Sequence, residues 1–379
     1  MLHRKVNIGI VGIGNMGMAH AATLGKMPTA NITAICALQK NKADIFAKKI
    51  NAKAYYDVDE MINSGDIEAI IIATPHYEHT TIALKAFVAG LHVLTEKPIA
   101  VHKADALKMI TAHNLRPDLR FAAMFNQRTK PAHLAIKKII EDGGLGEIRR
   151  INWTITDWFR TEHYYNSGGW RGTWQGEGGG VLLNQCPHQL DLFQWFFGLP
   201  IKVRAFCQIG QYHQIEVEDN VTAYCEFKNG ATGIFIASTG EAPGTNRLEV
   251  TGELGKFVLE DDKLTFTRNQ QEMSIFSKQA KQGFSKPEVQ KIDVEIKEQK
   301  TQEHQVILEN FCDCILDKEL TLIAPAEEGV KSVELANAMI FSSFKEMTVE
   351  MPLDGGAYEE LLNNKIKHST LLKSSKKST

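Results

Sequence analysis

VNIGIVGIGNMG, residues 6–17, is the part of this chain from which its architecture can first be predicted. The apolar stretch Val6 to Val11 is typical of a short buried strand, and Met18 to Lys26 is typical of a helix. Between them lies a loop of the form G-x-G-x-x-G, whose glycines permit a tight turn, a close approach to a pyrophosphate and tight packing of helix on strand. The loop therefore predicts a dinucleotide site, with candidate contacts at Gly12, Ile13, Gly14, Asn15, Met16 and Gly17.

The next hundred residues continue the alternation of strand and helix. Apolar runs at 31–38, 69–73, 91–95 and 120–125 alternate with helical stretches that include 43–50, 80–89 and 103–113. This order predicts a doubly wound parallel sheet, which binds ligands at the carboxyl ends of its strands. Polar residues that follow these strands are candidate cofactor contacts (Thr74, Pro75, His76 and His79) or substrate contacts (Asn126 and Arg128). His76 and His79 could approach the nicotinamide ribose or could be ordinary polar loop residues.

The end of the second strand bears on the choice between NAD and NADP. An acid about 20 residues beyond the glycines usually binds the ribose 2′-OH, but this strand ends at Ala37 without a carboxylate. A 2′-phosphate is then not repelled, and Lys40 or Lys42 could contact it, which favours NADP. If both lysines are simply solvated at a helix start, NAD remains equally open.

Glu96-Lys97-Pro98 closes the apolar run at 91–95. A lysine at this edge of an open sheet can hold a substrate oxygen or take part in proton transfer. Pro98 biases Lys97 toward an extended conformation. Taken alone, such a tripeptide is more often a solvated strand end, and the role of Glu96 is undefined.

From residue 148 the pattern changes to consecutive strands with short turns, which predicts a mainly antiparallel sheet. Helices could cover one face of such a sheet and a second subunit the other. We expect a Rossmann domain at 1–126, a substrate-binding and oligomerisation domain at 127–360 and a flexible basic tail at 361–379. Residues 269–300 are polar and predict a β-excursion or a loop.

Two segments of the second part supply candidate substrate contacts. An aromatic insertion after the first strand contains Tyr165, Trp170 and Arg171, which suit a polyhydroxylated ring but could also form a packed loop. Residues 181–195 predict a helix with Asn184, His188 and Asp191 on one stripe and a kink at Pro187. A lone helical histidine is usually structural, but this one has an amide and a carboxylate beside it, as an oriented acid or base would.

Composition excludes several classes of function. The 379 residues carry a formal net charge of −2, so neither nucleic acid nor an anionic membrane surface is an expected partner. No apolar run approaches the roughly 20 residues of a membrane span. The six cysteines form no C-x-x-C pair, which predicts no metal site and a reduced, cytoplasmic protein.

These motifs occur in an order that resembles the Gfo/Idh/MocA family, which includes glucose–fructose oxidoreductase and inositol dehydrogenase. The resemblance rests on the glycine loop, Thr74-Pro75, Glu96-Lys97-Pro98 and the Asn184…His188…Asp191 series, and extends to the late stretch 332–338. It implies a Rossmann domain, a C-terminal domain with an open antiparallel sheet that commonly forms dimers or tetramers, and NAD(H) or NADP(H) as cofactor. By this resemblance Lys97 and His188 match the catalytic lysine and histidine.

Asn184 departs from the aspartate that inositol dehydrogenases often have at this position. An amide cannot carry a proton, although it can hydrogen-bond a hydroxyl, so inositol is in doubt as the substrate. We expect hydride transfer between nicotinamide and a secondary alcohol or ketone of a sugar, sugar derivative or cyclitol. In this mechanism His188 takes the hydroxyl proton and Lys97 stabilises the alkoxide. The alternatives are an NAD-dependent glycoside hydrolase with transient redox chemistry and a non-catalytic sugar or cofactor sensor.

Overall fold

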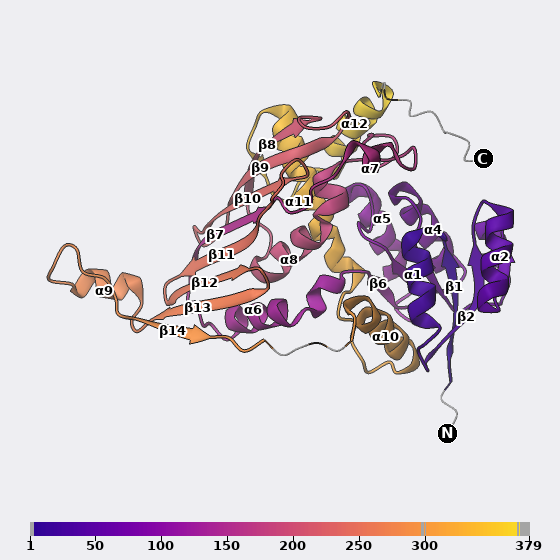
Figure 1. Cartoon of the computed structure of the whole chain (residues 1–379), viewed down its shortest axis with the longest axis horizontal. Helices are drawn as coiled ribbons and strands as arrows, with labels where there is room; N and C mark the ends of the chain where they lie inside the picture. The colour runs from indigo at the N-terminus through magenta and orange to yellow at the C-terminus, as the bar shows by residue number, and fades with distance from the viewer. Residues whose placement is uncertain (1–3, 297–298, 300, 370, 372–379) are drawn as a thin grey trace. The chain divides into compact units, whose positions relative to one another are not determined.

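The computed structural model describes residues 4–296, 299, 301–369 and 371. Its contacts form two compact units, which are described here one at a time. The first comprises Met1–Thr129, Gly176–Gly178 and Lys300–Glu334, and the second comprises Lys130–Gln175, Gly179–Gln299 and Leu335–Thr379. Figure 1 shows the elements of both units with their labels.

The first unit contains a parallel sheet of six strands in its described residues, in the order β3-β2-β1-β4-β5-β6. The strands β1, β4 and β5 are almost wholly buried because their runs of Val, Ile and Leu lie under helices. The strands are β1 (Val6–Val11), β2 (Ala30–Cys36), β3 (Lys53–Tyr55), β4 (Ala69–Ile72), β5 (His92–Thr95) and β6 (Phe121–Ala123). The prediction of a doubly wound parallel sheet is confirmed, although the short β3 had not been predicted.

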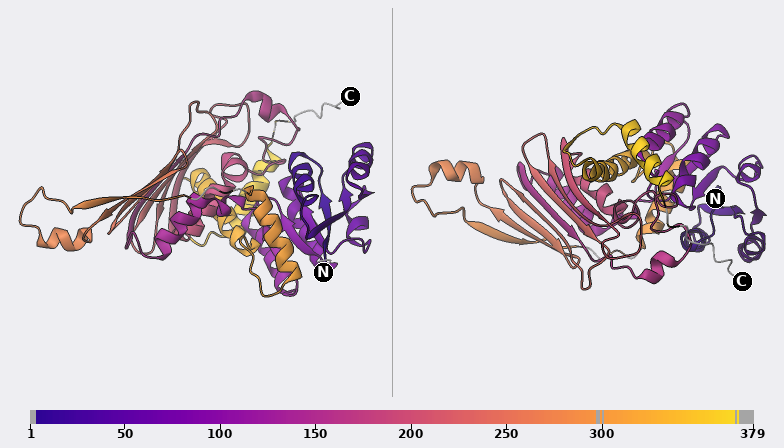
Figure 2. Two further views of the ribbon diagram at one scale, coloured as in Figure 1. Left: turned by 60° about the horizontal axis from the view of Figure 1, so that its bottom comes forward. Right: turned by 90° about the horizontal axis from the view of Figure 1, so that it is seen from above.

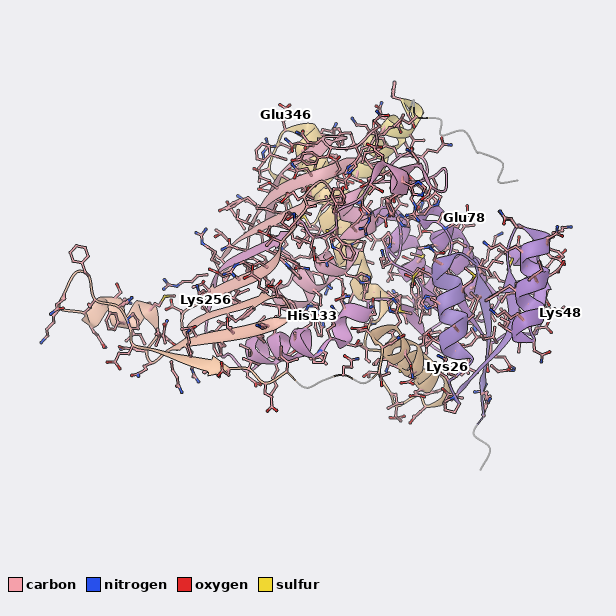
Figure 3. The ribbon with its side chains drawn as sticks, in the orientation of Figure 1. Lys26, Lys48, Glu78, His133, Lys256 and Glu346 are labelled. Atoms are coloured by element: carbon pink, nitrogen blue, oxygen red, sulfur yellow. The ribbon has the colours of Figure 1, made fainter. Side chains whose placement is uncertain are left out.

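Helices pack on this sheet in the order expected of βαβ units. The helix α1 packs against α10, and α4 packs against α3 and α5. Charged side chains such as Lys26, Lys48 and Glu78 are exposed and point outward (Figure 3). The helices are α1 (Asn15–Leu24), α2 (Lys40–Ile50), α3 (Val58–Ile62), α4 (His76–Val88), α5 (Lys103–Asn114), the 3-10 helix η1 (Asn126–Thr129) and α10 (Glu303–Leu316).

The first unit also includes Lys300–Glu334, which had been predicted as part of one continuous C-terminal domain. Leu308 and Phe311 of α10 are completely buried and belong to the same apolar core as β1, β4 and β5. Next, Ala123 of β6 donates its N–H to the carbonyl of Ala324 at 3.0 Å. The chain therefore returns to the first unit because the apolar face of α10 is buried there.

The second unit contains a sheet of nine strands among the described residues, in the order β14-β13-β12-β11-β7-β10-β9-β8-β15. Only the β7–β10 pair is parallel there, so the prediction of a mainly antiparallel sheet is confirmed. The strands are β7 (Ile148–Ile155), β8 (Lys202–Ile209), β9 (Glu218–Glu226), β10 (Thr232–Ser238), β11 (Asn246–Gly252), β12 (Gly255–Glu260), β13 (Lys263–Asn269), β14 (Val289–Asp293) and β15 (Val349–Glu350).

Helices gather on one face of this sheet, as Figures 1 and 2 show. Phe193 of α8 meets Phe235 of β10 edge to face, with 6.0 Å between the ring centroids, and Trp153 of β7 packs on the same ring. The helices are α6 (Pro131–Glu141), α7 (Glu162–Asn166), the π-helix η2 (Val181–Gln185), α8 (Pro187–Phe197), α9 (Met273–Gln279), α12 (Gly355–Lys367) and the second half of α11 (Ala326–Lys345).

The predicted single helix at 181–195 is wrong, because it consists of two elements. The π-helical turn η2 ends at Gln185, and α8 begins at Pro187, where the missing N–H costs nothing. Glu218 of β9, which is fully buried, accepts the N–H groups of Gly180 and Leu182 at 2.9 and 3.1 Å. This carboxylate caps the π turn, so Pro187 starts a helix rather than kinking one.

Two C-terminal expectations also change. The polar stretch 269–300 contains both the short helix α9 and the edge strand β14. Residues 361–367, expected in a flexible tail, belong to α12, which Asp354 caps and Tyr358 and Leu362 anchor by burial. Residues 372–379 lie outside the described residues. None of the helices in the described part of the chain is long and apolar enough to cross a membrane.

Candidate active site

The glycine-rich loop connects β1 to α1 in the first unit. Gly12 has φ of 91°, and a Cβ there would lie 2.4 Å from the carbonyl oxygen of Ala73. A Cβ on Gly17 would lie 1.8 Å from the carbonyl oxygen of Gly12, so α1 packs directly on the loop. A Cβ on Gly14 would meet no described heavy atom within 4 Å. The loop is therefore closed on its protein side and open at Gly14.

The start of α1 fits a dinucleotide phosphate. Gly14 is the N-cap residue, and no described side chain caps the helix or places a carboxylate in its first turn. The first N–H groups of the helix thus keep their capacity for an anion. Beside the loop, after β4, the Thr74 Oγ1 is buried and makes no hydrogen bond to any described residue. These groups could hold the cofactor, together with Ile13 of the loop, Asn15 and Met16 at the start of α1, and Pro75 after Thr74.

The end of β2 has no acid for a ribose. Ala37 donates its N–H to Tyr55 O at 3.1 Å, and its methyl group leaves the position uncharged. Lys40, the first residue of α2, holds its ammonium 5.0 Å from the ring centroid of Tyr56. Tyr56 in turn donates its hydroxyl to Asp44 at 2.6 Å. The Lys40 ammonium over the Tyr56 ring is therefore a cation that could contact a 2′-phosphate.

Lys97 follows β5 at the carboxyl edge of the parallel sheet and is half-buried. Its N–H donates to the Glu96 Oε2 at 3.2 Å, and the other carboxylate oxygen of Glu96 lies 2.7 Å from His20 Nε2. Burial raises the pKa of the Glu96 carboxyl, but the hydrogen bond and charge of His20, with the charges of Lys97 and His304, lower it to about 2. Glu96 is therefore an anchored carboxylate behind Lys97.

His76 and His79 lie in the first turn of α4, and both are buried. His76 Nδ1 is 3.0 Å from the carbonyl oxygen of Glu177, which belongs to the same unit. His79 is completely buried, with Nδ1 at 2.8 Å from Pro98 O and Nε2 at 2.9 Å from Thr74 O. Both ring nitrogens of His79 therefore face backbone carbonyls, and His79 connects the loops after β4 and β5.

Asn126 and Arg128, both in η1, differ in what they contact. Asn126 is buried, its Nδ2 lies 3.4 Å from His304 Nδ1, and its Oδ1 has no hydrogen-bond partner among the described residues. That oxygen is available to a ligand donor. Arg128 is 1% exposed, pairs with Glu328 and lies over the ring of Phe125. Its guanidinium thus ties η1 to α11 through Glu328.

In the second unit, Asn184 and His188 share one accessible side of a buried segment. Both are half-buried, whereas the other residues from Val181 to Gln194 are buried. Asn184 lies in the π-helical turn, and His188 is the second residue of α8. Asp191, predicted on the same stripe, is 1% exposed and accepts the side-chain N–H of Gln194 at 3.0 Å. The histidine and the amide are thus the members of this series that can face a ligand.

Tyr164 is the centre of the polar cluster beside Asn184. Its hydroxyl oxygen accepts the Arg171 Nη1 at 2.7 Å, the Asn184 Nδ2 at 3.2 Å and the Gln185 Nε2 at 3.2 Å. Its ring lies 4.4 Å from the guanidinium carbon of Arg171, which also lies 4.6 Å from the Trp170 ring. Arg171 and Trp170 are therefore grouped with Asn184 through a tyrosine that the sequence analysis did not select.

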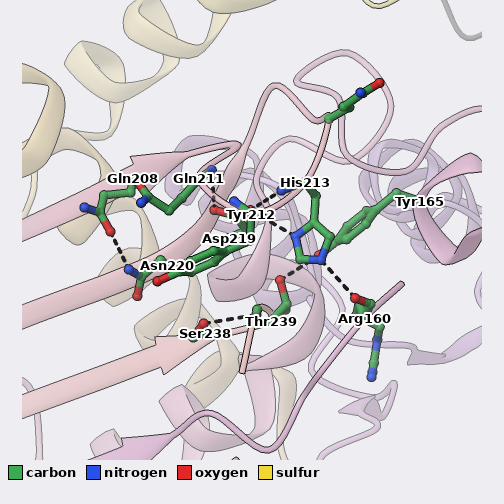
Figure 4. A network of polar contacts seen from close by, with 12 residues as sticks. Arg160, Tyr165, Gln208, Gln211, Tyr212, His213, Asp219, Asn220, Ser238 and Thr239 are labelled. Atoms are coloured by element: carbon green, nitrogen blue, oxygen red, sulfur yellow. Dashed lines mark hydrogen bonds and ion pairs between the residues drawn. The ribbon is translucent and has the colours of Figure 1, made fainter. Parts of the chain in front are cut away.

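Tyr165, the next residue, lies in a separate polar network beside His213 and Thr239 (Figure 4). Its side chain is 1% exposed, its hydroxyl is 2.9 Å from Thr239 Oγ1, and its ring packs on His213. His213 in turn bonds to Asp219, a fully buried carboxylate that also accepts backbone N–H groups at 211–213. The short helix α7 thus turns Tyr165, which was predicted as a substrate contact, toward Thr239 and His213.

Two histidines that were not predicted from the sequence, His20 and His304, surround Glu96. The ring centroids of the two histidines are 6.0 Å apart. His20 is on α1 and His304 on α10, which are separated by almost the whole chain. Only the position of Glu96, an acid without an assigned role, could have suggested that such partners exist.

Comparison with known proteins gives a consistent result for both units. A model described as an oxidoreductase family with an NAD-binding Rossmann fold matches residues 6–118. A model of the GFO/IDH/MocA C-terminal domain matches residues 133–258.

Individual relatives agree with these models. Trans-1,2-dihydrobenzene-1,2-diol dehydrogenase of Bos taurus is 29% identical over 258 residues, which are 67% of this chain and 73% of that protein. Levoglucosan dehydrogenase of Pseudarthrobacter phenanthrenivorans is 27% identical over 317 residues, and the match covers 74% of this chain and 79% of that protein. The crystal structure of the WlbA dehydrogenase from Chromobacterium violaceum with NADH and UDP-GlcNAcA superposes with a TM-score of 0.78 at 25% identity, covering 93% of this chain and 98% of that one.

Proposed function

This chain belongs to the GFO/IDH/MocA family of NAD-binding oxidoreductases, and on that premise we propose that it oxidises or reduces a secondary alcohol or ketone of a sugar, sugar derivative or cyclitol. The observation that carries the proposal is the common edge of the parallel sheet. The glycine loop after β1, Thr74 after β4 and Lys97 after β5 all follow the carboxyl ends of adjacent strands. An open α/β sheet binds its ligand at this edge.

The fold binds NAD(H), and the residues of the loops fit that cofactor. We assign the pyrophosphate to the start of α1, with Gly14 giving it access, and a hydroxyl or amide of the cofactor to the unsatisfied Thr74 Oγ1. When bound, the nicotinamide supplies the two-electron redox chemistry. Ala37 and the Lys40 ammonium favour NADP(H), because a 2′-phosphate meets no carboxylate there and gains a cation.

We assign the acid/base work to Lys97 and His188. In oxidation, the role assigned to the His188 imidazole is to take the proton of the substrate hydroxyl, and the role assigned to the Lys97 ammonium is to stabilise the negative charge that develops. The Asn184 amide hydrogen-bonds a neighbouring hydroxyl but carries no proton. In reduction, His188 returns the proton to the oxygen.

The cluster around Tyr164 supports a hydroxylated ring as the substrate. Trp170 offers an aromatic face to C–H groups, and the half-buried Arg171 and Asn184, which Tyr164 holds together, offer N–H donors to hydroxyls. The relatives named above are a trans-1,2-dihydrobenzene-1,2-diol dehydrogenase and a levoglucosan dehydrogenase, and the WlbA structure contains UDP-GlcNAcA. A sugar, a sugar derivative or a cyclitol is therefore the proposed substrate.

We also propose a homodimer or homotetramer formed by the open face of the large sheet. Phe206 of β8 and Tyr224 of β9 are 61% and 39% exposed on adjacent strands, and large apolar side chains of this kind mark contact surfaces. Sedimentation equilibrium should give a multiple of the monomer mass, and Phe206→Asp should lower it. We also propose a reducing, cytoplasmic location, because the six cysteines of the sequence form no C-x-x-C pair.

The test is a panel of sugars, sugar acids and cyclitols assayed with NAD⁺ and with NADP⁺ by the absorbance of the reduced nicotinamide. At least one substrate should give net reduction, whereas a hydrolase with transient redox chemistry would release sugar without it. Lys97→Ala and His188→Ala should each lose turnover by about 100-fold or more. Lys85→Ala, an exposed lysine on α4, is the matched control and should keep full turnover. Near-full activity in both site variants would refute the assignment.

A further inference from the structure

The turn that carries Lys97 is bonded on both sides to buried histidines from two different helices. On one side, Glu96 Oε1 lies 2.7 Å from Nε2 of His20, which is on α1 and 1% exposed. On the other side, Pro98 O lies 2.8 Å from Nδ1 of His79, which is on α4 and completely buried. Glu96 and Pro98 are the chain neighbours of Lys97, so its main chain is tied at both flanks.

Each histidine connects this turn to a segment that borders the dinucleotide loop. His20 lies in the helix that begins at the glycine-rich loop, so its bond to Glu96 ties the Lys97 turn to α1. His79 also reaches Thr74 O at 2.9 Å, so one imidazole joins the loops that follow β4 and β5. Glu96 completes the connection through its second oxygen, which accepts the N–H of Lys97 at 3.2 Å.

The chemistry of the partners explains why histidine occupies these places. Both ring nitrogens of His79 face carbonyl oxygens, and burial lowers the pKa of its imidazole, so the neutral ring donates its one N–H to Pro98 O or to Thr74 O. The carboxylate of Glu96 can only accept from His20 and from the Lys97 N–H. A leucine at either histidine position would fill similar space but leave these buried acceptors unsatisfied, which costs about 1–3 kcal/mol per group.

We propose that His20 and His79 are positioning residues that hold the Lys97 turn at a defined place relative to the glycine loop and the Thr74 loop. This inference rests on the proposed role of Lys97. It assigns to Glu96 the role of the connecting carboxylate and to both histidines a role in catalysis without contact to the substrate. An error of 1 Å in such a position can cost a large factor in rate, so loss of either connection should lower kcat.

The test compares His79→Leu and His20→Leu with His79→Gln and His20→Gln, in which the side-chain amide keeps N–H donors. Hydrogen exchange of the cofactor-free protein reports on the turn itself, and steady-state kinetics with a substrate from the panel report on its consequence. We expect the leucine variants to exchange the Lys97 amide on the order of tenfold faster while β1 keeps its protection, and to lower kcat on the order of tenfold with little change in KM. The glutamine variants should recover most of the wild-type protection of the Lys97 amide and most of the wild-type kcat.

His113→Leu is the matched control, because His113 is another mostly buried histidine of this unit, with Nε2 at 3.0 Å from Leu119 O, and it packs on Phe121. It should leave exchange at Lys97 and kcat as in the wild type. Unchanged Lys97 exchange and kcat in the leucine variants would overturn the inference. If a leucine variant does not fold, the glutamine variants decide the question. A glutamine variant that folds but has a kcat no higher than that of Lys97→Ala counts against the inference. Full turnover in Lys97→Ala would instead refute the proposed function.

Discussion

Two alanine substitutions in the glycine loop should separate cofactor binding from folding. At Gly14, φ is −70° and ψ is −168°, which alanine can adopt, and its Cβ would meet no described atom within 4 Å. The reduced entropy of the unfolded chain should stabilise Gly14→Ala by about 0.4–1 kcal/mol. Loss of a favourable N-cap residue costs a similar amount. The free energy of unfolding of the cofactor-free Gly14→Ala variant should therefore stay within about 1 kcal/mol of the wild type.

The methyl group of Gly14→Ala should instead obstruct the pyrophosphate, since close backbone approach is what this glycine permits. We expect the Kd for NADH or NADPH to rise about tenfold, which corresponds to about 1.4 kcal/mol. At a nucleotide concentration of 100 times the wild-type Kd, the wild type gains about 2.7 kcal/mol of stability from binding, and Gly14→Ala should gain about 1.4 kcal/mol. Thermal unfolding with and without nucleotide measures this difference.

Gly17→Ala is the contrasting variant. Its Cβ would lie 1.8 Å from Gly12 O, so α1 must move off β1, and overpacking of this kind costs on the order of 1–3 kcal/mol. The cofactor-free protein should therefore unfold at a lower temperature. If Gly14→Ala bound nucleotide as the wild type does, or if Gly17→Ala were as stable as the wild type, the assignment of separate roles to these glycines would be wrong.

Two further results are expected. The pKa of Glu96 is lowered to about 2 from an ordinary value of 4.5, so its ionised form stabilises the fold fully above pH 4.5 and this contribution disappears as the pH falls through 2. Acid unfolding should accordingly show a smaller loss of stability between pH 4.5 and 2 in Glu96→Gln than in the wild type, and equal slopes would contradict the shift. Tyr164→Phe should raise the substrate KM by about tenfold with the nucleotide Kd unchanged, because Arg171 and Asn184 lose a common acceptor. Tyr165→Phe, its neighbour, should instead lower the unfolding free energy by about 1 kcal/mol and leave KM unchanged, and the reverse pattern would refute the assignment.

The two sheets and the dinucleotide loop could be predicted because their signals are local. Val6 to Gly17 combines an apolar strand, a glycine loop and a helix start within a dozen residues. Lys97 could be selected because it follows an apolar strand, and in a parallel sheet all such positions meet at one edge. The break of the helix at 181–195 could not be predicted, because it depends on Glu218, a buried carboxylate from a strand more than 30 residues away.

Polar site residues were harder to predict from the sequence than apolar strands and helices, because their partners also come from distant segments. Arg128 and His79 follow strands as ligand-binding residues do, yet their polar atoms are used by Glu328 and by backbone carbonyls. Tyr164 and Tyr165 are adjacent in sequence, and only the orientation of α7 turns the first toward Asn184 and the second toward Thr239. The sequence alone does not show which of the two tyrosines faces Asn184.

The parallel and antiparallel sheets, the open glycine loop and the position of Lys97 at a strand end follow from local sequence patterns. Residue periodicity, glycine conformation and strand order suffice for these features, and they are properties of short segments. Tertiary packing, in contrast, determines which polar groups remain available to a ligand, which of them connect distant segments and where α10 packs. Buried donors and acceptors must be satisfied, and their partners here, such as His20 for Glu96 and Thr239 for Tyr165, come from remote parts of the chain.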